Sequence, residues 1–297
     1  LEIGISCIDL SIGKNIIYEI PYKKEDPNYI IDELYRFVNS YNPKEVIVYF
    51  NNVEQKLQTQ IITSLDIDER LVKQVNYDIN YRKLEVQEVM LQEIFKPSCM
   101  TSVFEYLNIE RLQIGVYSYI HLLLFIKEHD NSKLLNLEKP TIYTNNEILN
   151  LNRNTIYRLN IIDSNQQENN TNVKSLFNVV DMTVTNIGKR TLKNRLLFPI
   201  TNVDTLNKRY DLADYFIHNN DTLNLFKNEL KNISDIERLN RKLMTLKLNK
   251  ESDLLNLHIS LTYLQKIFTN INYSLLNILA IDETFIKDFN TFYNKIT

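Results

Sequence analysis

Hydrophobic and polar positions in the first third of the chain alternate between short apolar runs and helical stripes. Two apolar segments, IGISCIDL and IIYEI, flank Gly13-Lys14-Asn15 and predict a β-hairpin within residues 1–22. A stripe spaced by three and four residues predicts a helix at 31–41, and the continuous run KEVIVYF predicts a buried strand at 44–50. A hairpin, a helix and a strand in this order predict a mixed-sheet α/β domain.

Three more helical stripes precede a polar connection that ends at Pro140. They lie within 53–61, 81–95 and 113–128, and the last is wide enough to face a core. We place a domain boundary between residues 138 and 139, where the composition changes. The expected fold is therefore multidomain, with an α/β domain at 1–138 followed by a second domain at 139–297.

The second half of the chain is predicted to be almost entirely helical. After an apolar segment at 155–162 and a polar surface loop at 163–174, apolar stripes occupy 203–217, 223–230, 236–246, 254–268 and 285–296. We expect Asp221 to cap the second of these helices, and Ser234 with Glu237 to form a capping box at the third. Five helices with short polar joints predict a mostly all-α domain.

Composition narrows the class of protein. The chain is 44% hydrophobic and 24% charged, as in ordinary globular proteins, and it lacks the apolar run of ~20 residues that a membrane span requires. Cys7 and Cys99 are too few for a disulfide framework and have no CxxC spacing, which indicates a reducing, intracellular compartment. A net charge of −3 excludes the strongly basic field of a free-standing nucleic-acid module.

Few side chains suggest chemistry. Asp9 at the end of the first strand is either a metal ligand of a nuclease or a turn carboxylate before Ser11, and no second carboxylate on a neighbouring strand supports the nuclease. His121 lies within an apolar stripe and is expected to be a core histidine, and the other three histidines are isolated. The basic residues near 190 alternate with leucines and form either a solvated face or a phosphate-contacting one, whose candidates are Lys189, Lys193 and Arg195.

One stretch, residues 175–257, carries a recognisable combination of residues. It begins with SLFNVVD at 175–181, and its signature positions are Asp181, Thr183, Thr185, Gly188, Arg190, Leu192 and Pro199, followed by Asp235, Glu237 and Arg238. Together these residues resemble the MutS family of DNA mismatch-repair proteins. The chain departs from the family pattern at Asn186, Lys189 and Arg195, where proline, a small residue and tryptophan are common.

The resemblance implies an RNase H-like α/β connector domain followed by the first segment of the α-helical core, or lever, domain. It implies that this piece couples an ATPase to a DNA clamp and that it is not itself an enzyme. We expect a segment of a longer protein, with the mismatch-reading domain before Leu1 and the clamp and ATPase after Thr297. The implied partners are mismatched or branched double-stranded DNA, a second MutS-like subunit, and a downstream repair factor at the connector, with no membrane.

We assign the binding of ATP phosphates to other parts of the longer protein, which is called the parent here. The sequence has no G-x-x-x-x-G-K-[ST] motif, and its four glycines are too scattered to form one. ATP and Mg²⁺ are therefore cofactors implied for the parent, and no catalytic, cofactor or metal residue is assigned here. The alternative functions are an RNase H-like metal-dependent nuclease with a helical accessory domain and a helical interaction scaffold.

The signature residues are expected to act structurally. Asp181, Thr183 and Thr185 are predicted to cap backbone N–H groups before a helix, because short polar side chains bond nearby amides. Gly188 is expected to permit a close approach or an unusual dihedral angle, and Arg190 to reach a carboxylate such as Asp181 or Asp235. At the far end of the chain we expect Phe285, Phe289 and Phe292 to expose an apolar face that favours self-association.

Overall fold

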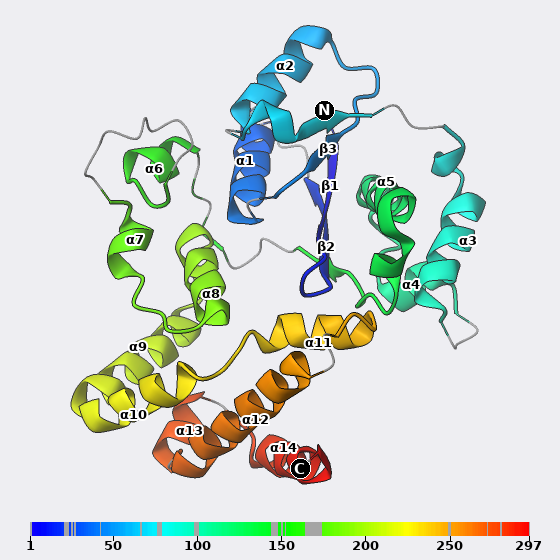
Figure 1. Cartoon of the computed structure of the whole chain (residues 1–297). Helices are drawn as coiled ribbons and strands as arrows, with labels where there is room; N and C mark the ends of the chain where they lie inside the picture. The colour runs from blue at the N-terminus through cyan, green and yellow to red at the C-terminus, as the bar shows by residue number, and fades with distance from the viewer. Residues whose placement is uncertain are drawn as a thin grey trace. The chain divides into compact units, whose positions relative to one another are not determined.

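The computed structural model divides the chain into two compact units. It describes residues 2–20, 24, 26, 28–41, 43–65, 67–75, 79–97, 101–143, 148–149, 151, 153–163, 174–248, 251–271, 273–279 and 281–296. Unit 1 comprises Leu1–Asn146 and Asn150–Val180, and unit 2 comprises Glu147–Leu149 and Asp181–Thr297 (Figure 1). Unit 1 continues past the predicted boundary between 138 and 139, which stays a prediction, and each unit is described by itself. Cys99 and most of the predicted loop at 163–174 lie outside the described residues.

The described strands of unit 1 form two small sheets. Strands β1 (Ile3–Asp9) and β2 (Lys14–Ile20) form the predicted antiparallel hairpin, and β5 (Thr141–Ile142) pairs in parallel with β2. Strand β3 (Val46–Val48) instead pairs in parallel with β4 (Val72–Gln74). The α/β class with a mixed sheet is therefore confirmed. The RNase H-like arrangement is not confirmed, and the strand predicted at 44–50 is shorter and only half-buried.

Helices make up most of the rest of unit 1. The four predicted helices are present with shifted ends, and α4, α6 and α7 are additional. Their bounds are α1 (Tyr29–Tyr41), α2 (Gln55–Ser64), α3 (Leu84–Phe95), α4 (Val103–Leu107), α5 (Gln113–Asp130), α6 (Arg153–Arg158) and α7 (Leu176–Val180). Helix α5 is the centre of the main core, since the side chains of Tyr119, Ile120 and Leu123 are fully buried there.

The first turn of α5 packs directly on the β-hairpin. The Ile114 and Gly115 N–H groups both donate to Glu19 Oε2 at 3.0 Å, so the carboxylate satisfies two free donors at the helix start. A Cβ atom on Gly4 of β1 would lie 2.3 Å from the Ile114 carbonyl oxygen. This spacing requires glycine at position 4, because the atom that it would meet belongs to the backbone.

Two buried polar clusters accompany this core. The Tyr119 hydroxyl donates to Asn15 Oδ1 at 2.8 Å, which ties α5 to the start of β2. In α1 the buried side chains of Arg36 and Glu33 form an ion pair, and the Tyr18 hydroxyl donates to Glu33 Oε2 at 2.9 Å. Buried charges are tolerated when they are paired and hydrogen-bonded, and this pair joins α1 to the sheet.

His121 is a core histidine, as predicted. Its side chain on α5 is buried, and the rings of Tyr117, Tyr49 and Tyr81 surround it with centroid distances of 4.3, 5.8 and 5.9 Å. The Arg82 guanidinium lies over the ring of Tyr117. Burial lowers the pKa of His121 to about 4, since an apolar surrounding disfavours the imidazolium.

Acidification is expected to destabilise unit 1 through His121. His121 takes up a proton near pH 6.5 in the unfolded chain but only near pH 4 in the folded chain. The contribution of the neutral imidazole to the free energy of unfolding is therefore complete above pH 6.5 and is lost as the pH falls toward 4. The slope should approach 1.4 kcal/mol per pH unit, roughly the equivalent of one bound proton. Urea unfolding followed by circular dichroism between pH 7.5 and 4.5 measures it.

His121→Phe should flatten this part of the pH profile, and the exposed His129→Gln, on the same helix, should not. The carboxylates titrate in all three proteins, so the comparison isolates the imidazole. An unchanged slope in His121→Phe would refute the assignment.

The regular elements described in unit 2 are all helices, apart from a bridge between Ile148 and Ile200. Its helices are α8 (Asn186–Leu197), α9 (Val203–His218), α10 (Asn220–Leu230), α11 (Ile236–Met244), α12 (Ser252–Asn270), α13 (Tyr273–Leu279) and α14 (Glu283–Ile296). The mostly all-α prediction and its five patterned helices are confirmed. Helix α13 was not predicted. A small core forms where Phe226, Ile267 and Leu275 meet the inner face of α9.

Two predicted helix caps are wrong. Helix α10 begins after Asn219, and Asp221 lies inside its first turn, where its charge faces the positive end of the helix dipole. Helix α11 is capped by Asp235, whose side chain accepts from the Arg238 N–H, rather than by Ser234. The Ser234 N–H donates instead to Ser260 Oγ at 3.0 Å, so the capping box does not form.

The C-terminal phenylalanines only partly match the prediction. Phe285 and Phe292 on α14 are exposed, whereas Phe289 packs against Phe268 with a centroid distance of 4.9 Å. Self-association through this face stays a prediction. Within the described part of the chain, none of the helices combines the length and the apolar character needed to cross a bilayer.

Candidate functional site: a charged joint between helices

The approach to α8 is held by short polar side chains, of which Asp181 and Thr185 accept from backbone N–H groups as predicted, whereas Thr183 acts as a donor. Asp181 Oδ1 accepts hydrogen bonds from the N–H and the hydroxyl of Thr183, which fixes the turn. Thr185 is the N-cap of α8, and its Oγ1 accepts from the Gly188 N–H at 3.0 Å. These bonds satisfy amides that the start of a helix would otherwise leave unpaired.

Gly188 brings the helix start close to these threonines. A Cβ atom at this position would lie 3.0 Å from Thr185 Oγ1 and 3.6 Å from Thr183 Cβ. Its backbone dihedral angle lies in the ordinary helical range for any residue, since the only glycine with positive φ among the described residues is Gly13. Of the two predicted reasons for this glycine, the close approach is therefore the correct one.

Arg190 joins α8 to α11. Its Nη1 lies 2.6 Å from Asp235 Oδ2 and its Nη2 lies 3.1 Å from Asp235 Oδ1, a two-point pairing, and Nη2 also reaches Glu237. The Asp235 side chain is only 10% exposed and Arg190 is 30% exposed. Because a bidentate, partly buried pair is stronger than a surface ion pair, this contact links α8 firmly to the start of α11. Of the two carboxylates predicted for Arg190, the structure selects Asp235.

The linked charged residues Asp181, Lys189, Arg190, Asp235 and Glu237 are called the joint below. Asp235 has two roles in it. It caps α11 and it neutralises Arg190, and Arg238 Nε lies 3.4 Å from its Oδ2. The hydrogen bond from Arg190 holds the pKa of the Asp235 carboxyl below its usual value, and the same bond raises the pKa of Arg190. The Thr183 hydroxyl similarly lowers the pKa of Asp181, assisted by Lys189. The joint is therefore fully charged at neutral pH.

The three candidates for nucleic-acid contact do not form a common free surface. Lys189 Nζ lies 3.2 Å from Asp181 Oδ2, so its charge is already paired. Lys193 is half-buried, and Arg195 is exposed at the end of α8. Partial burial lowers the pKa of Arg195, and the nearby Arg209 of α9 lowers it further. Contact of these residues with a nucleic acid stays a prediction.

The remaining signature positions are Leu192, Pro199 and Arg238, and each contributes a different contact. Leu192 is half-buried on α8, and its neighbour Leu197, which the sequence pattern did not single out, is fully buried. The Pro199 carbonyl accepts from the Leu149 N–H at 2.7 Å, so the end of α8 is tied to an upstream segment of unit 2. Arg238 contributes through Asp235, as described above.

A second ion pair extends the joint to α12, and sequence reasoning missed it. Lys242 Nζ lies 3.0 Å from Asp253 Oδ1, and the Asp253 side chain is 10% exposed. About two turns further along α12, the buried Ser260 hydroxyl accepts from the Ser234 N–H and donates to the Asn256 carbonyl at 2.7 Å. The only available signal was Ser252-Asp253 at the start of an apolar stripe, which is typical of a helix N-terminus but identifies no distant partner.

Asp9 and Cys7, the two other side chains that could suggest chemistry, lie in local structural settings. Asp9 Oδ1 accepts from the Ser11 N–H at 2.8 Å and from its hydroxyl, so it is the predicted turn carboxylate. No group of three or more His, Cys, Asp or Glu side chains converges among the described residues. Burial, with a smaller contribution from Asp9, raises the pKa of the Cys7 thiol to about 12, which keeps it unreactive.

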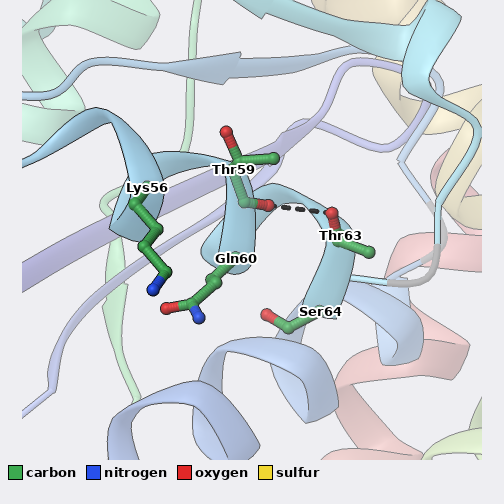
Figure 2. A pocket seen from close by; sticks show the side chains of 5 residues that line it. All are labelled: Lys56, Thr59, Gln60, Thr63 and Ser64. Carbon is green, nitrogen blue, oxygen red and sulfur yellow. Dashed lines mark hydrogen bonds between the residues drawn. The ribbon is translucent and has the colours of Figure 1, made fainter.

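An open depression of about 520 Å³ lies along α2, and Figure 2 shows the side chains that line it. They are Lys56, Thr59, Gln60, Thr63 and Ser64. The Thr63 hydroxyl donates to the Thr59 carbonyl at 2.8 Å, and Thr59 and Ser64 likewise bond to their own helix. Because these hydroxyl donors are already used within α2, hydrogen-bond donation to a ligand would rest on Lys56 and Gln60.

Comparison with known proteins decides the family. The profile of MutS domain III matches residues 154–288, which include every signature position of the joint. A DNA mismatch repair mutS homolog of Acanthamoeba polyphaga mimivirus is 32% identical in an alignment 267 positions long, which covers 82% of this chain and 24% of the homolog. The chain belongs to the MutS family. The MutS proteins of Caldanaerobacter subterraneus and Borrelia hermsii are 27% and 26% identical, and they cover 89% and 84% of the chain.

The similarity extends across both units of this MutS-family chain. The alignments cover more than the domain III segment, so the α/β unit is included in the relationship. The chain spans about a quarter of the length of these relatives, 24% to 28%. The role of the signature residues as a family-specific joint stays a prediction that rests on their contacts.

Proposed function

We propose that this chain is the connector and the first core, or lever, segment of a MutS-like protein that acts in DNA mismatch repair. Its task is mechanical: it carries rigid-body displacement between an ATPase and a DNA clamp that belong to the longer protein. The observation that supports this most directly is the Arg190–Asp235 pair, which joins α8 to the N-cap of α11 through two hydrogen bonds. A lever must transmit rotation without bending at its joints, and charged, partly buried pairs provide such stiffness.

The second ion pair continues the same path. Lys242 on α11 pairs with Asp253 on α12, so three helices are connected in series by two charged contacts. Helix α12 has 19 residues, which makes it the longest described helix of unit 2 (Figure 1). Coupling through packed helices and ion pairs is an established physical route for displacement between distant sites.

Unit 1 is proposed to be the connector, in the RNase H-like arrangement of the family. Its antiparallel hairpin, its mixed sheet and its central helix α5 support this proposal. In this role it would offer its surface to a downstream repair factor. A second MutS-like subunit and mismatched or branched double-stranded DNA are the further proposed partners of the longer protein.

ATP and Mg²⁺ are proposed for the longer protein and not for these residues. The four glycines serve other purposes: Gly4 and Gly115 pack strand against helix, Gly13 turns the hairpin, and Gly188 lies beneath the Thr185 cap. None of them belongs to a phosphate-binding loop. The chain's own residues would contribute only the position and stiffness of the helices on which other domains depend. The nuclease alternative gains no support from Asp9, whose carboxylate is bonded within its own turn.

Binding of this chain to labelled homoduplex and mismatched duplexes tests the proposal. We expect no preference for the mismatch, because the paired charges of the joint leave few cations to contact phosphate. Tight, mismatch-selective binding by this chain alone would refute a purely mechanical role. Cleavage of the same duplexes with Mg²⁺, lost in Asp9→Asn, would instead favour the nuclease.

Coupling is tested in the full-length protein proposed here. Arg190→Met should leave ATP hydrolysis without DNA unchanged and reduce its response to mismatched DNA by about tenfold, a typical coupling free energy. Lys231→Met, which removes an exposed cation from the same unit, is the matched control. An unaltered response in Arg190→Met would refute the lever role of this joint.

A further inference from the structure

The hydroxyl of Ser260 on α12 holds the backbone that leads into α11. Ser260 is fully buried, and its Oγ accepts from the Ser234 N–H at 3.0 Å while it donates to the Asn256 carbonyl at 2.7 Å. Ser234 directly precedes Asp235, the N-cap of α11, so its amide lies outside the hydrogen-bond ladder of that helix. Because a partly buried amide is costly to leave unpaired, this bond fixes the chain where α11 begins.

The Asp235 carboxylate depends on that backbone position because it makes two kinds of contact with the same atoms. Its Oδ1 accepts from the Arg238 N–H at 3.4 Å as the helix cap and from Arg190 Nη2 at 3.1 Å. Its Oδ2 accepts from Arg190 Nη1 at 2.6 Å. The cap is already a long hydrogen bond, so a small shift of residue 235 sacrifices either the cap or the two-point pairing with Arg190.

Two contacts join α11 to α12, and they differ in how strictly they define position. From Ser234 to Lys242 along α11 the partners run back along α12 from Ser260 to Asp253, so the two helices run in opposite directions. A displacement of α12 along its axis by about two residues, roughly 3 Å, carries Ser260 out of reach of the Ser234 amide. The flexible four-carbon stem of Lys242 can follow Asp253 over such a distance. The serine contact is therefore the one that is sensitive to the position of α12.

We propose that Ser260 is a positioning residue through which the location of α12 along its own axis controls the Arg190–Asp235 pair. While Ser260 holds the Ser234 amide, the start of α11 is fixed and Asp235 can cap its helix and pair with Arg190 together. When α12 is displaced, the start of α11 is released and the link to α8 weakens. This inference rests on the proposed lever function and deepens it, because it names the contact by which α12 acts on the joint.

A double-mutant cycle tests the proposal. Urea unfolding at neutral pH of Arg190→Met, Asp235→Asn and the combined variant gives the coupling between the two side chains, and the cycle is repeated with Ser260→Ala added throughout. We expect the coupling, expressed as an equilibrium constant, to fall at least about fivefold with Ser260→Ala. A purely structural role for Ser260 would destabilise all members of the cycle alike and leave the coupling unchanged. That result would overturn the proposal.

Thr269→Val is the matched control for Ser260→Ala. It also removes a hydroxyl from α12, but Thr269 is exposed and bonds only to the Lys266 carbonyl of its own helix. We expect it to leave the coupling intact, and an equal loss in both variants would overturn a specific role for Ser260. Hydrogen exchange of the Ser234 amide, followed by NMR, should become about tenfold faster in Ser260→Ala only. An unchanged exchange rate in that variant would overturn the contact itself.

These outcomes are distinct from the test of the lever. If Ser260→Ala leaves the coupling unchanged, this inference fails, while the response of ATP hydrolysis to mismatched DNA in Arg190→Met still decides the lever role. If the coupling falls but Arg190→Met leaves that response unaltered, Ser260 positions the joint as proposed and the lever role is the part that fails.

Discussion

Gly4→Ala is expected to unfold unit 1 or to cost it about 4 kcal/mol. The added methyl carbon would lie 2.3 Å from the Ile114 carbonyl oxygen, 2.5 Å from the carbonyl carbon and 2.8 Å from the Gly115 nitrogen. All three atoms belong to the backbone, so no side-chain rotation can relieve the clash. The first turn of α5 would have to move away from β1, and the two hydrogen bonds from this turn to Glu19 would be strained or lost. Urea unfolding followed by circular dichroism measures the loss, because the chain has no tryptophan to serve as a probe.

Gly115→Ala is the matched control for this effect. Its methyl carbon would meet the Ile17 Cγ2 atom at 2.8 Å, and a side-chain methyl group can shift where a carbonyl cannot. Alanine also favours the helix over glycine by about 1 kcal/mol, which offsets part of the crowding. We therefore expect a loss below about 2 kcal/mol. A larger loss for Gly115→Ala than for Gly4→Ala would contradict the packing described for β1 and α5.

The helices of this chain could be predicted from sequence because their apolar residues recur with the helical period. The stripes at 203–217 and 254–268 correspond to α9 and α12 with ends shifted by a few residues. The period, however, does not say what a stripe faces. On α9 the stripe that predicts the helix is the exposed one, while residues outside it fill the core. Periodicity thus revealed the helix but did not identify its buried side.

Short strands and the long-range partners of side chains were harder to predict from the sequence. Strand β4 has three residues, too few for an alternating pattern to be visible, so the pairing of β3 with β4 was not foreseen. The N-cap of α11 was misassigned because Ser234 and Asp235 are both good N-cap residues, and the choice depends on Arg190, 45 residues upstream in sequence. Arg190 itself was correctly expected to pair with a carboxylate, since a guanidinium within a leucine-rich helix requires one.

Asp235→Ala is expected to destabilise unit 2 by about 3 kcal/mol. About 1 kcal/mol reflects the lost N-cap of α11, and the rest reflects the two charge-assisted hydrogen bonds to Arg190, whose guanidinium would stay partly buried beside Glu237 alone. Amide hydrogen exchange measures this locally, and we expect α11 to lose the most protection. Asp235→Asn keeps an oxygen that can cap the helix and should cost about half as much.

The pH dependence of stability distinguishes the contribution of the Asp235 charge from the contribution of Asp235 as a helix N-cap. The folded pKa of this carboxyl lies below its unfolded value of 3.8, so its contribution is complete above pH 3.8 and is lost as the pH falls through the folded pKa. The stability difference between the wild type and Asp235→Asn should therefore shrink in that acidic range and stay constant above it. Glu237→Gln, at a side chain that is 49% exposed, should cost less than about 1 kcal/mol. If Glu237→Gln cost as much as Asp235→Ala, Arg190 would be held mainly by the exposed carboxylate, and α11 would not be locked to α8 in the way a lever requires.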